Sequence, residues 1–198
     1  MVRLIRQAQS DPVMGTLSYI KNYLKDRDVA SVTPSSRFLV RRICRRMDFN
    51  EPRIIVEYGP GEGVFSNHIW KRMSPDSRLI LIETNPDFTR KLQALTTSER
   101  VEVVQDTAEN VKDILANRDI AGADYVLSGI PFSFFDEQDR EALIRTTRDV
   151  LKPGGQFLVY QHHDHMDEPL RRIFAQVEAE REWLNVPPIH VHAATKST

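Results

Sequence analysis

Two hydrophobic periods alternate along the chain. Short runs rich in Ile, Val and Leu read as buried strands, and the segments between them repeat apolar residues every three or four positions, as amphipathic helices do. The predicted strands span about residues 54–59, 79–83, 101–105, 123–128, 156–161, 177–184 and 189–195. The predicted helices span about residues 12–25, 36–47, 63–73, 86–95, 108–117, 136–151 and 167–175.

This alternation of strand and helix predicts an α/β fold, in which a mostly parallel sheet carries helices on both faces. The length of 198 residues suits one such domain. Hydrophobic residues make up 40% and charged residues 28%, as in ordinary globular proteins. Cys44 is the single cysteine, which excludes an intrachain disulfide and a cysteine metal cluster.

The first predicted strand ends in a glycine-rich turn. Its sequence is Gly59-Pro60-Gly61-Glu62-Gly63, preceded by the acidic Glu57. Glycines let the backbone turn sharply and approach a ligand closely. The second predicted strand ends at Glu83, which is placed to accept hydrogen bonds from two ribose hydroxyls. This layout indicates a nucleoside ligand at the carboxyl ends of parallel strands.

The glycine pattern separates two kinds of nucleoside ligand. A dinucleotide fingerprint needs a glycine at position 64, which is Val64 here. The observed G-x-G-x-G with Glu57 upstream resembles motif I of the class I S-adenosylmethionine (SAM) methyltransferases. The third strand ending in Asp106 and the L-K-P-G-G turn at 151–155 also resemble that family, over about residues 30–194. An acid near the turn suits the SAM ammonium group.

The resemblance implies a Rossmann-like class I methyltransferase fold, with a seven-stranded sheet whose last strand is antiparallel. It implies SAM as methyl donor and S-adenosylhomocysteine as product. Glu83 would hold the ribose, and Asp106 would receive the adenine amine. The implied cofactor-binding residues are Glu57, Tyr58, Gly59, Pro60, Gly61, Gly63, Glu83, Thr84, Asp106, Thr107, Ala108 and Ser128.

The segment after the fourth strand bears on the methyl acceptor. In methyltransferases of exocyclic base amines it reads Asn/Asp-x-Pro-aromatic, whereas residues 128–132 read Ser-Gly-Ile-Pro-Phe. A hydroxyl orients an aryl amine less well, which disfavours adenine. The chain more closely resembles bacterial phospholipid and ornithine-lipid N-methyltransferases, which share this segment, a Pro-Ser-Ser at 34–36 and an Asn-x-Pro-Pro at 185–188. The predicted function is N-methylation of a phospholipid or aminolipid headgroup amine.

Two alternatives stay open at this point. The first is an RNA methyltransferase of the ribosomal adenine type, against which stands the lack of a helical RNA-binding domain after residue 195. The second is a SAM-binding module without activity. Labelled SAM offered with lipid and with RNA separates the three hypotheses.

The attacking amine must first lose a proton, so a base or a water path is needed. Tyr19, His162 and His163 are the candidates for that role. Tyr19 could instead hold a cationic headgroup over its ring or pack in the core. The expected catalytic and acceptor-lining residues are Tyr19, Ser128, Pro131, Phe132 and His162.

The histidine run at 162–165, His-His-Asp-His, raises the question of a metal site. It lies at a strand end, where neighbouring side chains point in opposite directions, and pairs of ligands one helical turn apart are missing. We therefore predict no metal there. The remaining interpretations of residues 162–165 are a loop that lines the acceptor pocket and a polar surface segment.

Charge is distributed unevenly. Residues 1–50 carry ten Lys and Arg against four acidic residues, a net charge of +6, and the remainder carries 17 against 24, a net charge of −7. We expect residues 1–30 to form an amphipathic basic helical segment and 31–198 the methyltransferase domain. The basic part indicates an anionic partner, a lipid surface before nucleic acid. The alternatives are a helix packed on the core and, for Arg41, Arg42, Arg45 and Arg46, a solvated face.

The sequence contains neither an apolar run long enough to span a membrane nor a signal-peptide core at its start. We expect a cytoplasmic protein that can sit peripherally on the inner face of the membrane.

Overall fold

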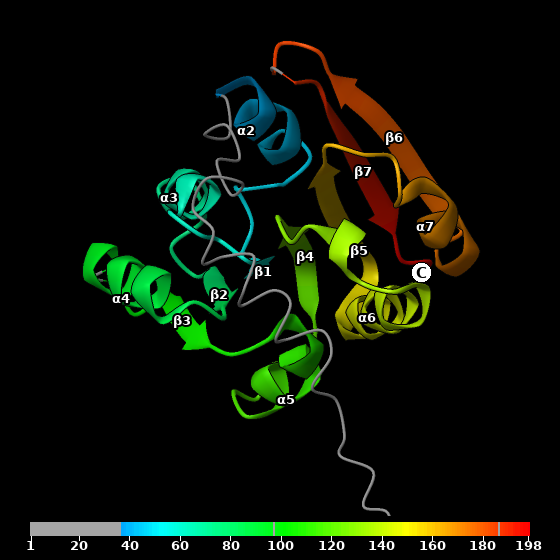
Figure 1. The fold of residues 1–198 in the computed structure, drawn as a ribbon. Coiled ribbons are helices and arrows are strands. Elements are labelled where there is room, and N and C mark those ends of the chain that lie inside the picture. Colours follow the sequence, from blue (N-terminus) through cyan, green and yellow to red (C-terminus); the bar gives the residue numbers. More distant parts are fainter. Residues whose placement is uncertain (1–36, 97, 186) are drawn as a thin grey trace, which may run out of the picture.

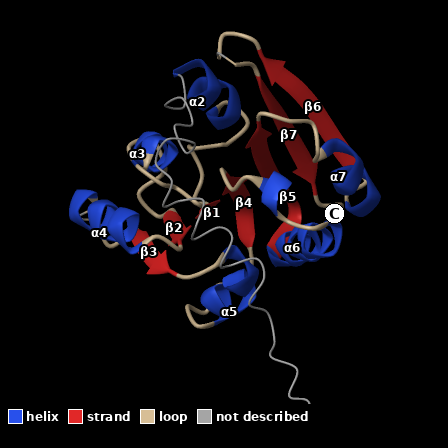
Figure 2. Ribbon diagram, in the orientation of Figure 1, coloured by secondary structure: helices blue, strands red, loops and turns tan. Residues whose placement is uncertain are grey.

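The computed structural model describes residues 37–96, 98–185 and 187–198, and it shows a seven-stranded sheet between two layers of helices (Figures 1 and 2). The strands are β1 Ile54–Tyr58, β2 Arg78–Glu83, β3 Val101–Gln105, β4 Ala123–Ser128, β5 Leu151–Gln161, β6 Gln176–Glu182 and β7 Ile189–Thr195. The α-helices are α2 Arg37–Cys44, α3 Val64–Trp70, α4 Pro86–Leu95, α5 Val111–Ala116, α6 Glu137–Val150 and α7 Asp167–Ile173. Two 3₁₀ helices are η1 Ala108–Asn110 and η2 Phe132–Phe134.

The strand order is β3-β2-β1-β4-β5-β7-β6. The first five of these strands are parallel, and β7 is antiparallel to both β5 and β6. The predicted fold, a mostly parallel seven-stranded sheet with an antiparallel last strand, is confirmed. Because β6 runs in the same direction as β5, the carboxyl ends of β1 to β6 share one side of the sheet, called the carboxyl edge below.

Burial on both faces explains why the strands are continuous apolar runs. Successive side chains of a strand point to opposite faces. In β2, Leu79 and Leu81 pack in the core that includes residues of α2, α3 and α4, whereas Ile80 and Ile82 pack in the core that includes residues of α5, α6 and α7. The two helical layers therefore each cover one face.

The element boundaries follow local chemistry. Asn85 caps α4, its Oδ1 accepting from the Asp87 amide at 2.8 Å, and Asp136 caps α6 in the same way toward Asp139 at 2.8 Å. Strand β5 begins at residue 151 rather than at 156, because Leu151 already pairs with Ala123 before a register shift. The predicted helix 36–47 is observed as α2, and the predicted helix 12–25 and the segment 1–30 lie outside the described residues.

The arginine run of α2 and the loop after it pairs with acidic side chains of β6. Arg42 Nε lies 2.6 Å from Glu182 Oε2, and Arg42 also contacts Glu180. Arg45 Nη2 lies 3.0 Å from Glu180, which Arg46 contacts as well. Three of the four arginines that the sequence offered to an anionic partner or to solvent thus serve to hold α2 against β6.

Candidate active site

The glycine-rich loop between β1 and α3 contains three residues with left-handed backbone angles. Gly59 has φ 62°, Gly61 has φ 55° and Gly63 has φ 77°. A Cβ on Gly63 would lie 2.7 Å from Leu92 Cδ2, and one on Gly59 would lie 3.2 Å from Ile130 Cγ1, so both glycines permit close packing. A Cβ on Gly61 would meet no described atom within 4 Å. Gly61 therefore borders open space at the carboxyl edge, where a ligand can approach the backbone.

Glu83 ends β2 directly beside this loop. Its Oε2 accepts from the Gly61 amide at 3.1 Å, and its Oε1 accepts from the Asn85 amide at 2.8 Å. The side chain is buried, and burial raises the pKa of the carboxyl group while the backbone amides oppose the shift. An ionised carboxylate has lone pairs left after two such bonds, so Glu83 can still accept from a diol.

Glu57, predicted to sit near a cationic ligand group, lies buried beneath the loop. Its Oε2 accepts from the Ser66 hydroxyl of α3 at 2.7 Å. Burial raises the pKa of Glu57 to about 7, the Ser66 hydroxyl lowers it, and the nearby Glu83 carboxylate raises it. Within the described residues no ion pair neutralises Glu57, so a cation bound next to it would favour its charged form.

The third carboxylate follows β3. Asp106 Oδ1 accepts from the Thr107 amide at 2.7 Å and from Asn110 Nδ2 at 2.8 Å. The Thr107 hydroxyl in turn caps η1 through the Glu109 amide at 3.3 Å. Ala108 is buried and leaves little bulk beside Asp106. Asp106 is thus held at the carboxyl edge by its own turn.

Two predicted cofactor residues on β1 and β4 have buried side chains. Tyr58 is fully buried, and its hydroxyl lies 3.3 Å from the Thr147 hydroxyl of α6. Ser128 is also fully buried, and its hydroxyl accepts from the Ile130 amide at 3.3 Å. The Tyr58 carbonyl accepts from the Gly129 amide at 3.1 Å, which ties the end of β1 to the residue after β4. Contact with a ligand through these two residues would run through the backbone.

The segment after β4 is clamped by a residue that sequence reasoning did not single out. Gln161 at the end of β5 accepts from the Phe132 amide at 3.2 Å and donates to the Ile130 carbonyl at 2.6 Å. Pro131 lies between the two clamped residues and is half-buried. The clamp fixes the backbone that the sequence analysis assigned to the acceptor.

The aromatic residues divide between core and edge. Phe132 is fully buried, and its ring packs against those of Phe135 and Phe157. Its expected contact with the acceptor stays a prediction, and it would require the segment to move. The Tyr160 ring lies next to the segment after β4. It stacks on Phe65 of α3 at 4.9 Å, and a Cβ on Gly129 would lie 2.4 Å from its hydroxyl.

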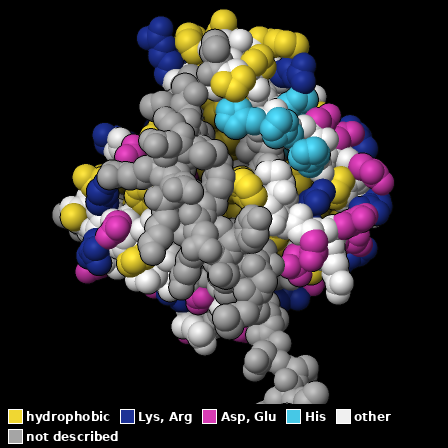
Figure 3. All heavy atoms as spheres, viewed as in Figure 1, with side chains coloured by type: hydrophobic (Ala, Val, Ile, Leu, Met, Phe, Trp, Pro, Cys, Tyr) yellow, Lys and Arg dark blue, Asp and Glu magenta, His cyan; other side chains and the backbone are white. Residues whose placement is uncertain are grey.

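Histidines gather where β5 and β7 meet, a grouping visible on one face of the molecule (Figure 3). Asp164 Oδ1 lies 3.2 Å from His192 Nε2, and Asp164 Oδ2 lies 3.9 Å from His190 Nδ1. The rings of His163 and His165 are 5.6 Å apart. Within the described part of the chain, no three His, Cys, Asp or Glu side chains are grouped to hold a metal ion. The H-x-H alternation of β7 was the sequence signal for this cluster.

His162 is half-buried next to these residues. Burial lowers the pKa of His162, and the neighbouring His163 lowers it further. Its ring is therefore neutral at neutral pH and able to accept a proton. Tyr19, the other predicted proton acceptor, lies outside the described residues.

Comparison with known proteins shows which family the chain belongs to. The family model described as "Methyltransferase domain" matches residues 55–155. An ornithine lipid N-methyltransferase of Singulisphaera acidiphila is 34% identical over 168 residues, which cover 81% of this chain and 84% of that protein. The chain belongs to the class I SAM-dependent methyltransferases.

Solved structures agree with this methyltransferase fold. The magnesium protoporphyrin IX methyltransferase of Synechocystis PCC 6803, with bound SAM, has a TM-score of 0.69 at 8% identity and covers 95% of this chain and 100% of its own. The 1,6-didemethyltoxoflavin-N1-methyltransferase of Burkholderia thailandensis, with bound S-adenosylhomocysteine, has a TM-score of 0.67 at 16% identity and covers 96% and 94%. At these identities the likeness concerns the fold.

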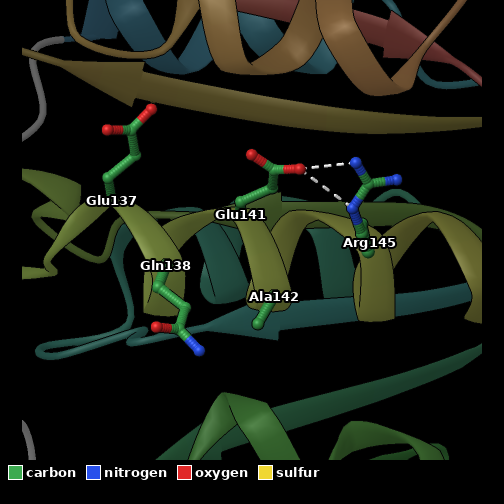
Figure 4. A pocket seen from close by; sticks show the side chains of 5 residues that line it. All are labelled: Glu137, Gln138, Glu141, Ala142 and Arg145. Atoms are coloured by element: carbon green, nitrogen blue, oxygen red, sulfur yellow. Dashed lines mark hydrogen bonds and ion pairs between the residues drawn. The ribbon is translucent and has the colours of Figure 1, made fainter.

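A hollow elsewhere on the methyltransferase lies away from this site. It has a volume of about 510 Å³ and lies along α6, lined by Glu137, Gln138, Glu141, Ala142 and Arg145 (Figure 4). All five side chains come from successive turns of one helix, and Glu141 accepts from Arg145 Nε at 3.1 Å. A groove made by one helix cannot enclose a nucleoside, so the carboxyl edge remains the candidate site.

None of the helices within the described residues combines the length and the hydropathy needed to cross a bilayer.

Proposed function

We propose that this methyltransferase transfers methyl groups from SAM to the amine nitrogen of an aminolipid or phospholipid headgroup. The observation that carries the proposal is the similarity to the ornithine lipid N-methyltransferase of Singulisphaera acidiphila, which extends over most of both chains. The Ser-Gly-Ile-Pro segment after β4, which disfavours a base amine, supports the same acceptor class.

The carboxyl edge offers a fitting set of groups for SAM. Glu83 would accept from the two ribose hydroxyls with the lone pairs that Gly61 and Asn85 leave free. Asp106 would accept from the adenine amine. The open space at Gly61 would admit the methionine portion, with Glu57 balancing its ammonium group. Bound there, SAM supplies an electrophilic methyl group on a sulfonium.

The protein's part in the chemistry is to align and deprotonate the acceptor. An alkyl amine is largely protonated at neutral pH, and only its free base can attack. His162 would take that proton, because its ring is neutral and lies just after the Gln161 clamp. The clamped segment at 130–132 would hold the amine in line with the methyl group.

The test is product identification. Purified protein is incubated with methyl-labelled SAM and, in separate reactions, with ornithine lipid, phosphatidylethanolamine and total RNA, and the products are resolved by mass spectrometry. We expect label in a lipid headgroup as N-methyl. Label that enters RNA but no lipid would replace the proposal with the RNA hypothesis. Tight SAM binding without transfer to either would identify an inactive module.

The base is tested by its pH profile. We expect His162→Gln to lower kcat about tenfold or more at pH 7 and to leave a smaller deficit at pH 9.5, where more of the amine is already free. His165→Gln, an exposed neighbour, is the matched control and should leave kcat within twofold. An equal deficit at both pH values would remove His162 from the proton path.

A further inference from the structure

The turn between β6 and β7 exposes two large hydrophobic side chains side by side. Trp183 is 65% exposed and Leu184 is 64% exposed. Because β6 ends at the carboxyl edge, this turn lies on the same edge as the candidate active site. Among the described residues, Leu95 is similarly exposed, at 67%, but it ends α4, whose chain runs from the carboxyl edge toward the opposite one.

The exposed pair sits on a well-held turn. The buried carboxylate of Glu182 accepts from the Leu184 amide at 2.9 Å with one oxygen and from Arg42 Nε at 2.6 Å with the other. Asn185, also buried, donates to the Pro187 carbonyl at 3.1 Å. Glu182 thus fixes the tip to α2, and the two hydrophobic side chains are presented to solvent without an evident structural need for them there.

An arginine side chain lies over each of two exposed aromatic rings at this end of the molecule. The Arg181 guanidinium lies over the Trp183 ring at 4.9 Å, and the Arg37 guanidinium lies over the half-exposed Phe38 ring at 5.0 Å. Since Arg42 meets Glu182 while Arg46 meets Glu178, the chain of α2 before Arg42 extends toward the carboxyl edge. Figure 1 shows the start of α2 and the β6–β7 turn at the same end of the molecule, where Figure 3 shows basic and hydrophobic side chains together.

A groove of about 530 Å³ continues this basic surface between α2 and α3. The cationic residues that line it are Arg37, Arg41, Arg45, Lys71 and Arg72, and no acidic side chain of the described residues lines it. Arg45 is paired with Glu180, but within the described residues Arg41 and Lys71 make no ion pair. Burial and the charge of Arg72 lower the pKa of His68. The side chains that line the groove therefore carry a net positive charge, of which Arg45 has an acidic partner.

We propose that this surface, Trp183 and Leu184 with Arg37, Phe38 and Arg41, docks the enzyme onto an anionic phospholipid bilayer. Trp is enriched at the depth of the lipid headgroups, where its ring contacts apolar groups and its N–H can hydrogen-bond to water. Arginine and lysine nearby meet lipid phosphates, each basic residue adding to the attraction. The inference rests on the proposed function, because a headgroup substrate must reach the carboxyl edge from a membrane. It adds an attachment separate from residues 1–36.

Vesicle co-sedimentation of the full chain tests the docking surface. The probes are phosphatidylglycerol vesicles and phosphatidylcholine vesicles, at low and high salt. We expect binding to the anionic vesicles that weakens with salt. Trp183→Ser with Leu184→Ser should weaken it roughly tenfold or more, and Arg37→Gln with Arg41→Gln severalfold.

Matched controls separate docking from general effects. Leu95→Ser removes an equally exposed hydrophobic residue near the opposite edge, and Arg90→Gln with Lys91→Gln removes two exposed cations from α4. Both should leave vesicle binding within twofold. If the turn and groove variants bind like these controls, the proposal is wrong. It is also wrong if they lose RNA affinity or dimerisation, measured by analytical ultracentrifugation, while keeping vesicle binding.

The experiment distinguishes failure of docking from failure of the proposed function. The turn variants should methylate a detergent-dispersed lipid at the normal rate and a vesicle lipid slowly. If no variant methylates lipid at all but vesicle binding still depends on the turn, the docking surface stands and the acceptor proposal falls.

Discussion

The carboxylate of Glu83, at the end of β2, accepts a hydrogen bond from the backbone amide of Gly61 in the loop after β1. One side chain therefore shapes the loop and faces the position expected for the ribose. Binding and loop geometry are coupled at this residue, which makes it the most informative position to change.

Glu83→Gln should weaken SAM binding by about 1–3 kcal/mol, because an amide nitrogen replaces one of the two acceptor oxygens. Isothermal titration calorimetry measures this as a rise in Kd of roughly tenfold to hundredfold. Glu99→Gln, an exposed carboxylate in the turn before β3, serves as the control. A Kd unchanged in Glu83→Gln would remove the ribose from this position.

Gly61→Val should abolish measurable SAM binding, because the new side chain enters the open space beside the loop. Its left-handed backbone also strains a β-branched residue, by about 1–3 kcal/mol. Gly154→Val is a close control. Gly154 has φ 77°, and a Cβ added to it would likewise meet no described atom within 4 Å. The two variants should lose similar thermal stability, and only Gly61→Val should lose SAM. Equal SAM affinity in both would contradict the placement of the pocket.

Glu57→Gln should make the ligand-free protein more stable at pH 8 and weaken its SAM binding. Burial raises the pKa of Glu57 from 4.5 to about 7, so between these values the folded state holds the proton more tightly than the unfolded state. Stability from this group is therefore present below pH 4.5 and lost as the pH rises toward 7, by roughly 3 kcal/mol in total. Urea unfolding at pH 4.5 and pH 8 should show the variant gaining stability at the higher pH alone.

The same substitution should alter the pH dependence of SAM affinity. Ionised Glu57 would attract the SAM ammonium, so affinity for the wild type should fall as the pH drops below about 7. The Glu57→Gln protein should show a flatter profile. Glu62→Gln, exposed in the same loop, should behave like the wild type. Parallel profiles for all three proteins would rule out this electrostatic role.

Gln161→Leu should lower kcat by about tenfold and leave the Kd for SAM within twofold. It removes both hydrogen bonds that hold residues 130–132, at about 1 kcal/mol each, without touching the loop after β1. Gln156→Leu, earlier on the same strand, is the control. A loss of SAM affinity equal to the loss of kcat would show that the clamp supports the whole edge rather than the acceptor side.

Much of the fold could be predicted because strand signals were unambiguous. Ile54–Tyr58 and residues 79–82 are mostly apolar runs followed by glycine or an acid, and both are observed as strands within one residue of the prediction. The start of β5 was missed because Leu151 joins the sheet through its pairing with Ala123, a contact between distant residues that local pattern cannot reveal. That Gly61, Glu83 and Asp106 lie at one edge of the sheet could be predicted, because parallel strands have their carboxyl ends on the same side.

Pairwise contacts were the hardest part to predict. Arg42, Arg45 and Arg46 looked available to an anion. The alternating acids Glu178, Glu180 and Glu182 of β6 pair with them instead. An i, i+2 acidic row on a predicted strand and an i, i+3, i+4 basic row on a predicted helix were the signals for this pairing. The Gln161 clamp had no such signal, because its partners are backbone groups.

The place of β7 inside the sheet has a consequence for how the molecule is made. Strand β6 leaves the ribosome before β7 does, yet it has no hydrogen-bonding partner until Ile189–Thr195 slides in between it and β5. Until then the edges of β5 and β6 that will pair with β7 have unpaired backbone groups, which can bind other chains. Shortening the chain before residue 195 should yield insoluble protein, while the nucleoside-facing half could already be assembled.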